Sequence, residues 1–310
     1  MPLFLRIVDR LTAEDPYFRQ RKDATGRLGL SPIQKCTAAI RLLAYGGGCD
    51  TVDEYVRLGE TTSCLRLQHF VTGIINFFGD EYLRRPTPED LQRLLHVAEE
   101  RGFPGMVGSI DCMHWVWKNC PTAWKGTFNY LNVLDRSPVF DDILYGQAPQ
   151  VTYYVNGREY NLTYYMTDGI YPNWTTFIQS IPLPQSPKAF LFAERQEGAR
   201  KDVERAFGVL QARFAVIKNP YLLWDKDKVG LIMRACIILH NMIVENERDE
   251  YTQANVSDFP QGDDVDLSYS IDMALNISNV LNGQIIIRDR EVHDQLKHDL
   301  VEHLWTKFGD

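Results

Sequence analysis

Three acidic residues in three different local contexts constrain this 310-residue chain more than any other feature. Asp111 ends the apolar run MVGSID and Asp168 ends the aromatic run LTYYMTD, so both are expected at the ends of strands. Glu204 lies in the helix-like segment ARKDVERAFGVLQARF. Burying unpaired carboxylates costs much free energy, so elements that bring three of them together need cations between them. The acids therefore favour a site for two divalent cations, which prefer oxygen ligands.

Two Mg²⁺ or Mn²⁺ ions about 4 Å apart can activate the attacking oxygen and stabilise the leaving oxygen in phosphoryl transfer. We expect Asp111 to bridge both ions, and Asp168 and Glu204 to hold one ion each. The chain has 41 acidic residues, so a chance trio is the alternative. The strand ends favour a site, because sites gather at the carboxyl ends of strands in open sheets. For Glu204, an exposed i to i+4 pair with Arg200 is equally compatible with its helix.

The charge of the chain is unevenly distributed. The formal net charge of -8 argues against a generally basic nucleic-acid-binding protein, but residues 241–310 alone carry 5 Lys or Arg against 15 Asp or Glu. The other residues are therefore close to neutral and leave room for local basic patches. The six cysteines form no CxxC pair, and no run of 18 apolar residues occurs. We expect reduced thiols in a soluble intracellular protein with no membrane segment.

Helical patterns fill the region before Phe103. Ser31 and Pro32 predict a helix start, and Gly46 predicts its end. A longer helix is expected from about Thr62 to Phe78, with one apolar face. The other signals are a possible capping box at Thr51 and Glu54 and a helix that starts within residues 86–89 and ends at Gly102.

These helices resemble a helix-turn-helix module, in which Arg66 and His69 would face DNA. A purely structural helical cap is the alternative. The stretch FRQRKDATGR near the N-terminus is basic, and either phosphate contact or a solvated surface would explain it. The solvated surface is favoured, because charge runs usually lie on the surface.

The region after Phe103 combines strand and helix signals. Asn156-Gly157 predicts the two-residue turn of a β-hairpin, and long helical patterns follow from Ser186 onward. The acidic, polar stretch after Arg248 predicts a disordered linker. The expected organisation is a helical, possibly DNA-binding region at 1–102, a nuclease-like domain at 103–247, an acidic linker at 248–267 and a C-terminal helical segment at 268–310.

Further candidate residues surround the three acids. Arg200, Lys201, Arg205 and Arg213 give the helix around Glu204 a basic face that could bind DNA phosphates. His114 follows Asp111 by three residues and could orient a phosphate, with a hydrogen-bonded strand histidine as the alternative. His240 and Asn241 are expected to make core hydrogen bonds to a neighbouring loop. No Gly-rich phosphate loop, nucleophile elbow or Cys-His dyad indicates another class of enzyme.

Several segments resemble successive blocks of the plant PIF/Harbinger transposases and their domesticated relatives: GSIDCMHWVWKNCPTAWKG, NVLDRSPVF, YYMTDGIYPNWTTFIQSI and KDVERAFGVLQARFAVIKNP. The resemblance covers nearly the whole chain. It implies an α/β (α+β) fold, with an RNase H-like DDE nuclease core behind an N-terminal helical, helix-turn-helix-like region. It also implies the triad Asp111, Asp168 and Glu204, a Mg²⁺ or Mn²⁺ cofactor, DNA as a partner, a Myb-like DNA-binding protein partner and residence in the nucleus. The oligomeric state stays open.

One departure from that family concerns the centre of the sheet. In the family, several dozen residues between the equivalents of WKGTF and NVLDRSPVF supply the second and third strands. Here Phe128 is followed almost at once by Asn132, and 56 residues separate Asp111 from Asp168. We therefore expect a core that lacks two central strands, with an unpaired edge on the Asp111 strand. A decayed copy and a mispredicted exon structure both explain the gap.

Two functions remain open at this point. The first is a transposase-derived DDE endonuclease that carries out metal-dependent hydrolysis or strand transfer on DNA, with catalysis impaired by the internal deletion. The second is a domesticated scaffold that binds DNA or a chromatin complex without catalysis. A protein unrelated to DNA is a third reading, and it requires the basic helix face to be a coincidence.

Overall fold

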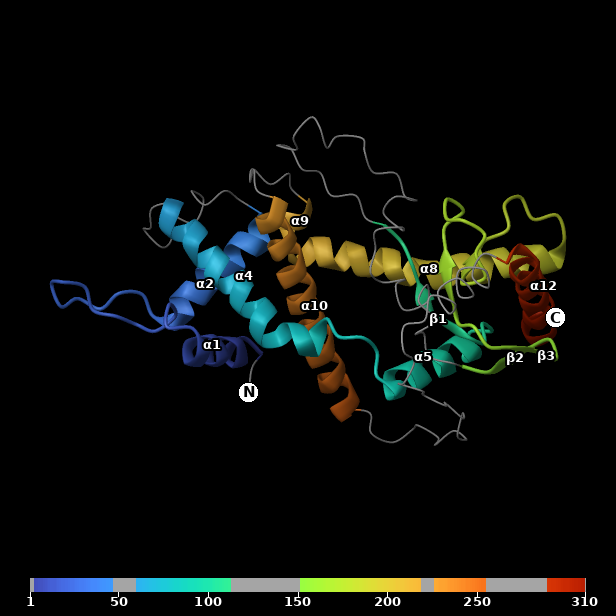
Figure 1. Cartoon of the computed structure of the whole chain (residues 1–310), viewed down its shortest axis with the longest axis horizontal. Helices are drawn as coiled ribbons and strands as arrows, with labels where there is room; N and C mark the ends of the chain where they lie inside the picture. Colours follow the sequence, from blue (N-terminus) through green and yellow to red (C-terminus); the bar gives the residue numbers. More distant parts are fainter. Residues whose placement is uncertain (1–2, 47–59, 113–150, 219–225, 255–288, 310) are drawn as a thin grey trace, which may run out of the picture. The chain divides into compact units, whose positions relative to one another are not determined.

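The computed structural model describes residues 3–46, 60–112, 151–218, 226–254 and 289–309 (Figure 1). By its internal contacts the chain divides into two compact units, and the long helix α8 (Pro187–Arg213) contributes residues to both, with the division after Ala206. Among the described residues, the first unit contains helices and one short bridged ribbon but no strand, and the second unit contains the strands.

The first unit is a helical pack around α4, which contacts α1, α2 and α10. The side chains of Leu11, Phe70 and Ile74 are fully enclosed in its core. The predicted start of α2 is confirmed, because Ser31 forms a reciprocal capping box with Gln34. The helices of this unit, besides the end of α8, are α1 (Leu3–Glu14), α2 (Pro32–Tyr45), α4 (Glu60–Tyr82), α9 (Ala215–Lys218) and α10 (Lys226–Ala254).

A polar cluster at the end of α4 joins three helices of this unit. Arg6 donates to the hydroxyl of Tyr82 (2.6 Å), and that hydroxyl donates to Glu245 (2.6 Å). Asn241 donates through Nδ2 to the carbonyl of Tyr82 (2.9 Å), so a hydrogen bond is present as expected, but its acceptor is the last residue of α4 and not a loop. The cluster therefore fixes α1 and α10 to the end of α4.

One stretch of α10, Asp227–Arg248, is long and apolar enough by composition to cross a membrane. Its apolar side chains have another explanation within the helical pack. Ile238 and Met242 are buried there, and α10 makes its most extensive contact with α4. The apolarity of α10 thus matches the role of a core helix.

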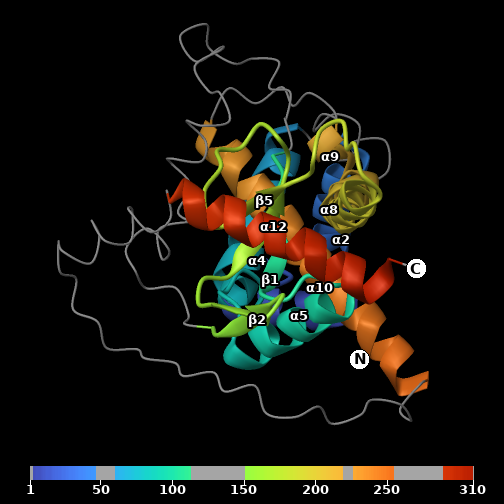
Figure 2. The ribbon, with the colours of Figure 1, turned by 90° about the vertical axis from the view of Figure 1, so that its right-hand side faces the viewer.

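The second unit is mixed α/β and is built around a three-stranded parallel sheet in the order β1-β4-β5. Helix α5 packs against β1, and α12 contacts β5 and the separate hairpin of β2 and β3 (Figure 2). The elements are α5 (Pro88–Glu100), β1 (Met106–Ser109), β2 (Tyr153–Val155), β3 (Arg158–Tyr160), β4 (Tyr164–Thr167), β5 (Phe177–Gln179) and α12 (Arg290–Phe308).

The main core of this unit collects one face of the sheet and the apolar sides of three helices. Tyr164 and Met166 of β4 lie in this core, whereas Tyr165 between them faces a smaller cluster, as the alternation of a strand requires. The helical contributions are Leu91, Leu95 and Ala98 from α5, Phe192 and Ala199 from α8, and Leu296, Leu300 and Leu304 from α12.

The predicted hairpin is confirmed with its predicted turn. Val155 pairs with Arg158, and the two residues between them, Asn156 and Gly157, have φ values of 49° and 78°. Positive φ at both central positions is the conformation that Asn-Gly favours.

The units differ from the expected domain boundaries in two places. Helix α5 lies before Phe103 in the sequence, yet it packs on β1 in the second unit. The described residues in the range 207–247 belong with the N-terminal helices, although they were expected in the nuclease-like domain. Burial of apolar faces decides both cases, since a helix joins the core that covers its apolar side.

The edge of β1 bears on the expected gap in the sheet. Of the strands that the structure describes, only β4 pairs with β1. The segment in which the missing strands would lie falls in residues 113–150, outside the described residues, as do the possible capping box at Thr51 and Glu54 and most of the acidic linker.

Candidate functional site

Asp111 and Asp168 follow two neighbouring strands of the parallel sheet. Asp168 comes directly after β4, and Asp111 comes two residues after β1. The pairing continues past the end of β1, where the backbone N–H of Ile110 donates to the carbonyl of Met166 (2.8 Å). Because parallel strands end at the same edge of a sheet, both partly buried carboxylates emerge at one edge.

Tyr171 lies beside both acids. Its backbone N–H donates to the carbonyl of Asp168 (3.2 Å), and its hydroxyl donates to Sγ of Cys112 (3.0 Å), the residue after Asp111. Burial raises the pKa of Tyr171, and the hydrogen bond to Cys112 and the charges of Asp111 and Asp168 raise it further. The hydroxyl therefore keeps its proton at neutral pH. Tyr171 bridges the two strand ends as a hydrogen-bond donor.

Tyr171 was not among the site residues predicted from the sequence. The available signal was its place in the turn TDGIYP, three residues after Asp168. A turn that follows an acid at a strand end returns the chain toward that acid, so an aromatic hydroxyl in it was a candidate.

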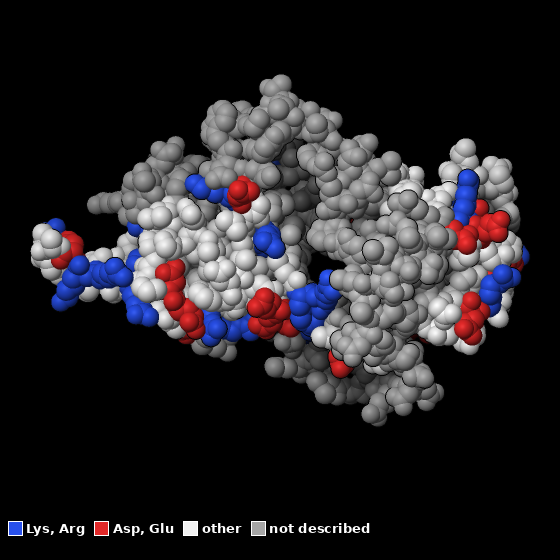
Figure 3. Space-filling model, in the orientation of Figure 1, with Lys and Arg blue, Asp and Glu red and all other residues white. Residues whose placement is uncertain are grey.

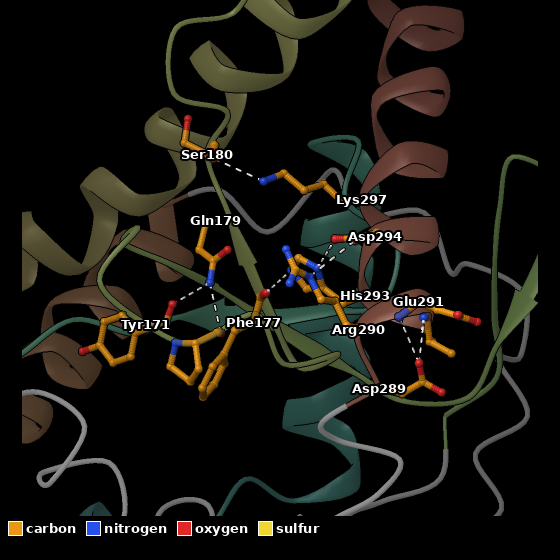
Figure 4. Close-up of polar contacts among 12 residues, drawn as sticks. Tyr171, Phe177, Gln179, Ser180, Asp289, Arg290, Glu291, His293, Asp294 and Lys297 are labelled. Atoms are coloured by element: carbon orange, nitrogen blue, oxygen red, sulfur yellow. Dashed lines mark hydrogen bonds and ion pairs between the residues drawn. The ribbon is translucent and has the colours of Figure 1, made fainter.

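The turn that carries Tyr171 is fixed from β5. The side-chain amide of Gln179 donates to the carbonyls of Tyr171 (2.9 Å) and Pro172 (3.0 Å), as Figure 4 shows. Helix α12 holds β5 in turn, because Nε2 of His293 donates to the carbonyl of Phe177 (3.1 Å) and Lys297 donates to that of Ser180 (3.3 Å).

Helix α8 crosses the same edge of the sheet and ties the strands to one another. The buried amide of Gln196 donates to the carbonyls of Thr167 and Ile178, each at 3.1 Å. The hydroxyl of Ser109 donates to the carbonyl of Ala199 (3.2 Å). The ends of β1, β4 and β5 are therefore all bonded to α8, close to where Asp111 and Asp168 emerge.

Glu204 lies further along α8 with a half-exposed side chain. Arg200 donates to its carboxylate (2.9 Å), so the i to i+4 pair that the sequence offered as an alternative is present. The Arg200 side chain is only 17% exposed. Among the described residues, no group of three His, Cys, Asp or Glu side chains is placed to hold a metal ion. Asp111 and Asp168 thus follow adjacent paired strands, whereas the Glu204 carboxylate is paired with Arg200.

Arg66 and His69 of α4 are placed differently from the expected DNA-reading face. Arg66 is buried, with 5% exposure, whereas a residue that reads DNA needs an exposed side chain. His69 stacks on the ring of Tyr17 with 3.9 Å between centroids, and its Nδ1 lies 3.1 Å from the carboxylate of Asp15. Both side chains serve the packing of the first unit. His114 lies outside the described residues.

The basic side chains of α8 have varied surroundings. Lys201 is exposed, and Arg205 is exposed while paired with Asp202 (3.0 Å). Arg213 donates twice to Glu247 (2.7 and 2.8 Å), which joins α8 to α10 within the first unit. Arg213 also approaches Nδ1 of His240 (3.3 Å), and burial together with this guanidinium lowers the pKa of His240.

Comparison with known proteins gives a family for this arrangement. The model of the family described as "Plant transposon protein" matches residues 80–131 and 125–251, which together exceed half of the chain. Two curated relatives are named "Putative nuclease HARBI1". The one from Bos taurus is 20% identical over 184 residues, which are 49% of this chain and 49% of that protein. The one from Rattus norvegicus is 19% identical over 199 residues, covering 53% and 54%.

The chain therefore spans about half the length of the curated relatives that it matches. No solved structure matches it. The resemblance to Harbinger-type transposases that the motifs indicated is confirmed by these matches. The chain belongs to the plant transposon protein family.

Proposed function

We propose that this protein is a transposase-derived endonuclease whose Asp111 and Asp168 hold Mg²⁺ or Mn²⁺ for cleavage of DNA phosphodiester bonds. The observation that carries the proposal is the position of the two acids, which follow adjacent, hydrogen-bonded parallel strands. The membership in a transposon family and the similarity to two proteins named as nucleases support it. The RNase H-like core, residence in the nucleus and a Myb-like partner are parts of the same proposal.

The donor set at the sheet edge fits a hard divalent cation. Two carboxylates supply anionic oxygen ligands, and both lie close enough to the Tyr171 hydroxyl to raise its pKa. A divalent cation bound there would polarise a phosphoryl oxygen and lower the pKa of a bound water. Asp111 and Asp168 would hold it.

The surrounding residues position this pair. Tyr171 links the Asp168 turn to Cys112, and Gln196 fixes the carbonyl that precedes Asp168. In the observed conformation Glu204 is bonded to Arg200, so its use as a third ligand requires that this pair open. Glu204 is half exposed but Arg200 is only 17% exposed, so opening the pair leaves a largely buried guanidinium without its carboxylate.

The family match supports reduced catalysis. It falls in two segments that overlap at residues 125–131, the place where the sequence motifs indicate an internal gap. A sheet that lacks strands beside β1 would hold Asp111 less rigidly, and catalysis falls steeply when a reacting group is displaced by about 1 Å. We therefore expect cleavage to be slow.

A non-enzymatic scaffold is the second candidate. The observation that favours it is the Arg200–Glu204 pair. Glu204 is the third acid that a three-carboxylate site would use, and its carboxylate is already bonded to Arg200. A DNA or chromatin-complex scaffold needs no third ligand. This function keeps DNA or protein binding and has no divalent-metal requirement.

Cleavage of supercoiled plasmid in Mn²⁺ tests the proposal. Wild type, Asp111→Asn and Asp168→Asn are compared, with Glu197→Gln as a matched control because Glu197 is an exposed acid of α8. We expect each site variant to lose more than about 100-fold in nicking rate, as loss of a metal ligand removes charge stabilisation of the transition state. The control should retain the rate.

Two results would count against the endonuclease. Equal nicking by wild type and both site variants would refute the assigned site. A wild type that binds DNA but shows no metal-dependent nicking would establish the scaffold.

A further inference from the structure

A short basic arm, residues 19–29, projects from the first unit between α1 and α2 (Figure 1). All of its side chains are exposed, and Leu28 near its base is 65% exposed. The arm carries four cations against one acid in a chain whose net charge is -8. In Figure 3 lysine and arginine side chains gather along the arm, at the left of the view. The cations are Arg19, Arg21, Lys22 and Arg27, and the acid is Asp23.

The arm is a formed ribbon with its own hydrogen bonds. Lys22 and Leu28 form an antiparallel bridge, the backbone N–H of Gly29 donates to the carbonyl of Arg21 (2.8 Å), and that of Asp23 donates to the carbonyl of Arg27 (2.9 Å). The two sides are thus held together before any ligand arrives, which lowers the entropy cost of binding.

The single acid of the arm is used inside its turn. The carboxylate of Asp23 accepts from the hydroxyl of Thr25 (2.7 Å) and from the backbone N–H groups of Thr25 (2.8 Å) and Arg27 (2.9 Å). The hydrogen bond from the Thr25 hydroxyl lowers the pKa of Asp23, and that from the Arg27 backbone adds to the effect. Asp23 stabilises the turn as an anion.

The base of the arm is fastened to the helical pack. Lys35 of α2 donates to the carbonyls of Tyr17 (2.8 Å) and Arg19 (3.0 Å). The amide of Gln20 donates to the carbonyl of Gly29 (2.7 Å) across the ribbon. The arm therefore has a fixed base and an exposed tip.

Two of the four cations face solvent without a structural task. Arg19 donates to the carbonyls of Thr12 and Ala13 at the end of α1. Lys22 and Arg27 make no side-chain hydrogen bond or ion pair with any residue that the structure describes. A solvated surface would not require the ordered ribbon that presents these two charges.

We propose that the basic arm binds the phosphate backbone of duplex DNA through Lys22 and Arg27. This inference rests on the proposed function in that DNA is the substrate, but it assigns a separate binding element. Exposed cations on an ordered support contact phosphates without reading sequence. The arm has no aromatic residue between positions 19 and 29, so it lacks the stacking surface typical of single-strand binding.

The salt dependence of DNA binding tests the arm. Fluorescence anisotropy with a labelled random-sequence duplex is measured from 50 to 200 mM salt for the full chain and for Lys22→Gln/Arg27→Gln. Each phosphate contact contributes about -0.9 to the slope of log affinity against log salt. Loss of two contacts therefore makes the slope less negative by about 1.8. The ratio of wild-type to variant affinity accordingly falls about 12-fold between 50 and 200 mM salt.

A matched control removes two exposed cations elsewhere in the same unit. Lys228→Gln/Arg234→Gln on α10 changes the net charge equally. We expect this control to keep the wild-type slope. Equal slopes for the arm variant and the control, or a wild type that does not bind duplex DNA, would overturn the proposal that the arm binds DNA. The wild-type chain and the arm variant are also measured on vesicles of anionic lipid. If the wild type binds the vesicles as tightly as it binds DNA, and the arm variant loses this binding to the same extent, the assignment to DNA is overturned.

The two proposals fail separately in these experiments. If the salt slope depends on the arm but no metal-dependent nicking occurs, the proposal that the arm binds DNA stands and the proposal of an endonuclease is rejected. If nicking depends on Asp111 and Asp168 but the salt slope does not depend on the arm, the proposal of an endonuclease stands and the proposal that the arm binds DNA is rejected.

Discussion

Replacement of Gln196 by methionine should loosen the sheet edge at which Asp111 and Asp168 emerge. Gln196 is fully buried, and its amide donates to the carbonyls of Thr167 and Ile178, each at 3.1 Å. Methionine has nearly the same length and shape but no donor. The variant therefore removes the link between α8 and the ends of β4 and β5 while it leaves little cavity.

The magnitude follows from these two bonds. A buried hydrogen bond contributes about 1 kcal/mol net, and an acceptor left without water costs about 1–3 kcal/mol. Loss of both bonds should therefore lower the local free energy of opening by at least about 2 kcal/mol. That change corresponds to an amide hydrogen exchange about 30-fold faster in β4 and β5.

Amide hydrogen exchange is the right assay, because a chain with two units need not unfold in one transition. The matched control is Glu194→Met, an exposed acid two residues away on the same helix, for which we expect a change within about 0.5 kcal/mol. Exchange in β4 and β5 that is unchanged by Gln196→Met would refute the role of Gln196 in holding the strand ends.

Three further predictions concern single contacts. Gly157→Ala should lower the free energy of opening of the β2–β3 hairpin by about 1–2 kcal/mol in amide hydrogen exchange, because φ is 78° at Gly157 even though no neighbouring atom obstructs a Cβ there, and Gly169→Ala should cost less. Burial acts to raise the pKa of Asp299, but hydrogen bonds from Tyr160 and Gln295 outweigh it and lower that pKa. The ionised carboxylate of Asp299 therefore stabilises the fold at any pH above the usual pKa range of aspartate, and this stabilisation is lost as the pH falls through the lowered pKa. Asp299→Asn should accordingly make the stability of the fold depend less on pH below about pH 4 in acid unfolding. Tyr171→Phe should weaken Mn²⁺ binding several-fold in titrations while exchange in β4 stays unchanged, and weakened binding with equally accelerated exchange would indicate a structural role alone.

Short-range signals in the sequence predicted the elements that depend on a few neighbouring residues. Ser31 with Gln34 set the start of α2, and Asn156-Gly157 set the hairpin turn, because caps and tight turns are closed by local hydrogen bonds. Helix α1 lies in the region that was expected to be helical, but no separate helix was predicted for Leu3–Glu14. Its buried residues Ile7 and Val8 become recognisable as a core face only against the other helices of the first unit.

The division into units depends on contacts between distant segments. Nothing local in the sequence of α5 distinguishes a helix that packs on β1 from one that closes an N-terminal bundle, since either core would bury its apolar face. The same applies to Arg66. A cation at a helical position is compatible with a DNA-facing surface or with burial beside Tyr17, and only the packing of residues 15–18 against α4 decides between them.

The difference between the two strand acids and Glu204 has the same physical origin. The positions of Asp111 and Asp168 follow from strand pairing, because β1 shifts register once, between Met106 and Gly108, and then pairs Gly108 with Tyr165 and Ser109 with Met166 up to the strand ends. The position of a helical residue depends on the rotation of the helix, and each residue turns the side chain by about 100°. In α8 the bonds from Gln196 and to Ala199 set that rotation, and it leaves Glu204 half exposed beside Arg200. An acidic residue on a helix can therefore reach a site at the sheet edge only if the packing of the helix turns that residue toward the edge. The spacing of acidic residues along a sequence does not encode this rotation.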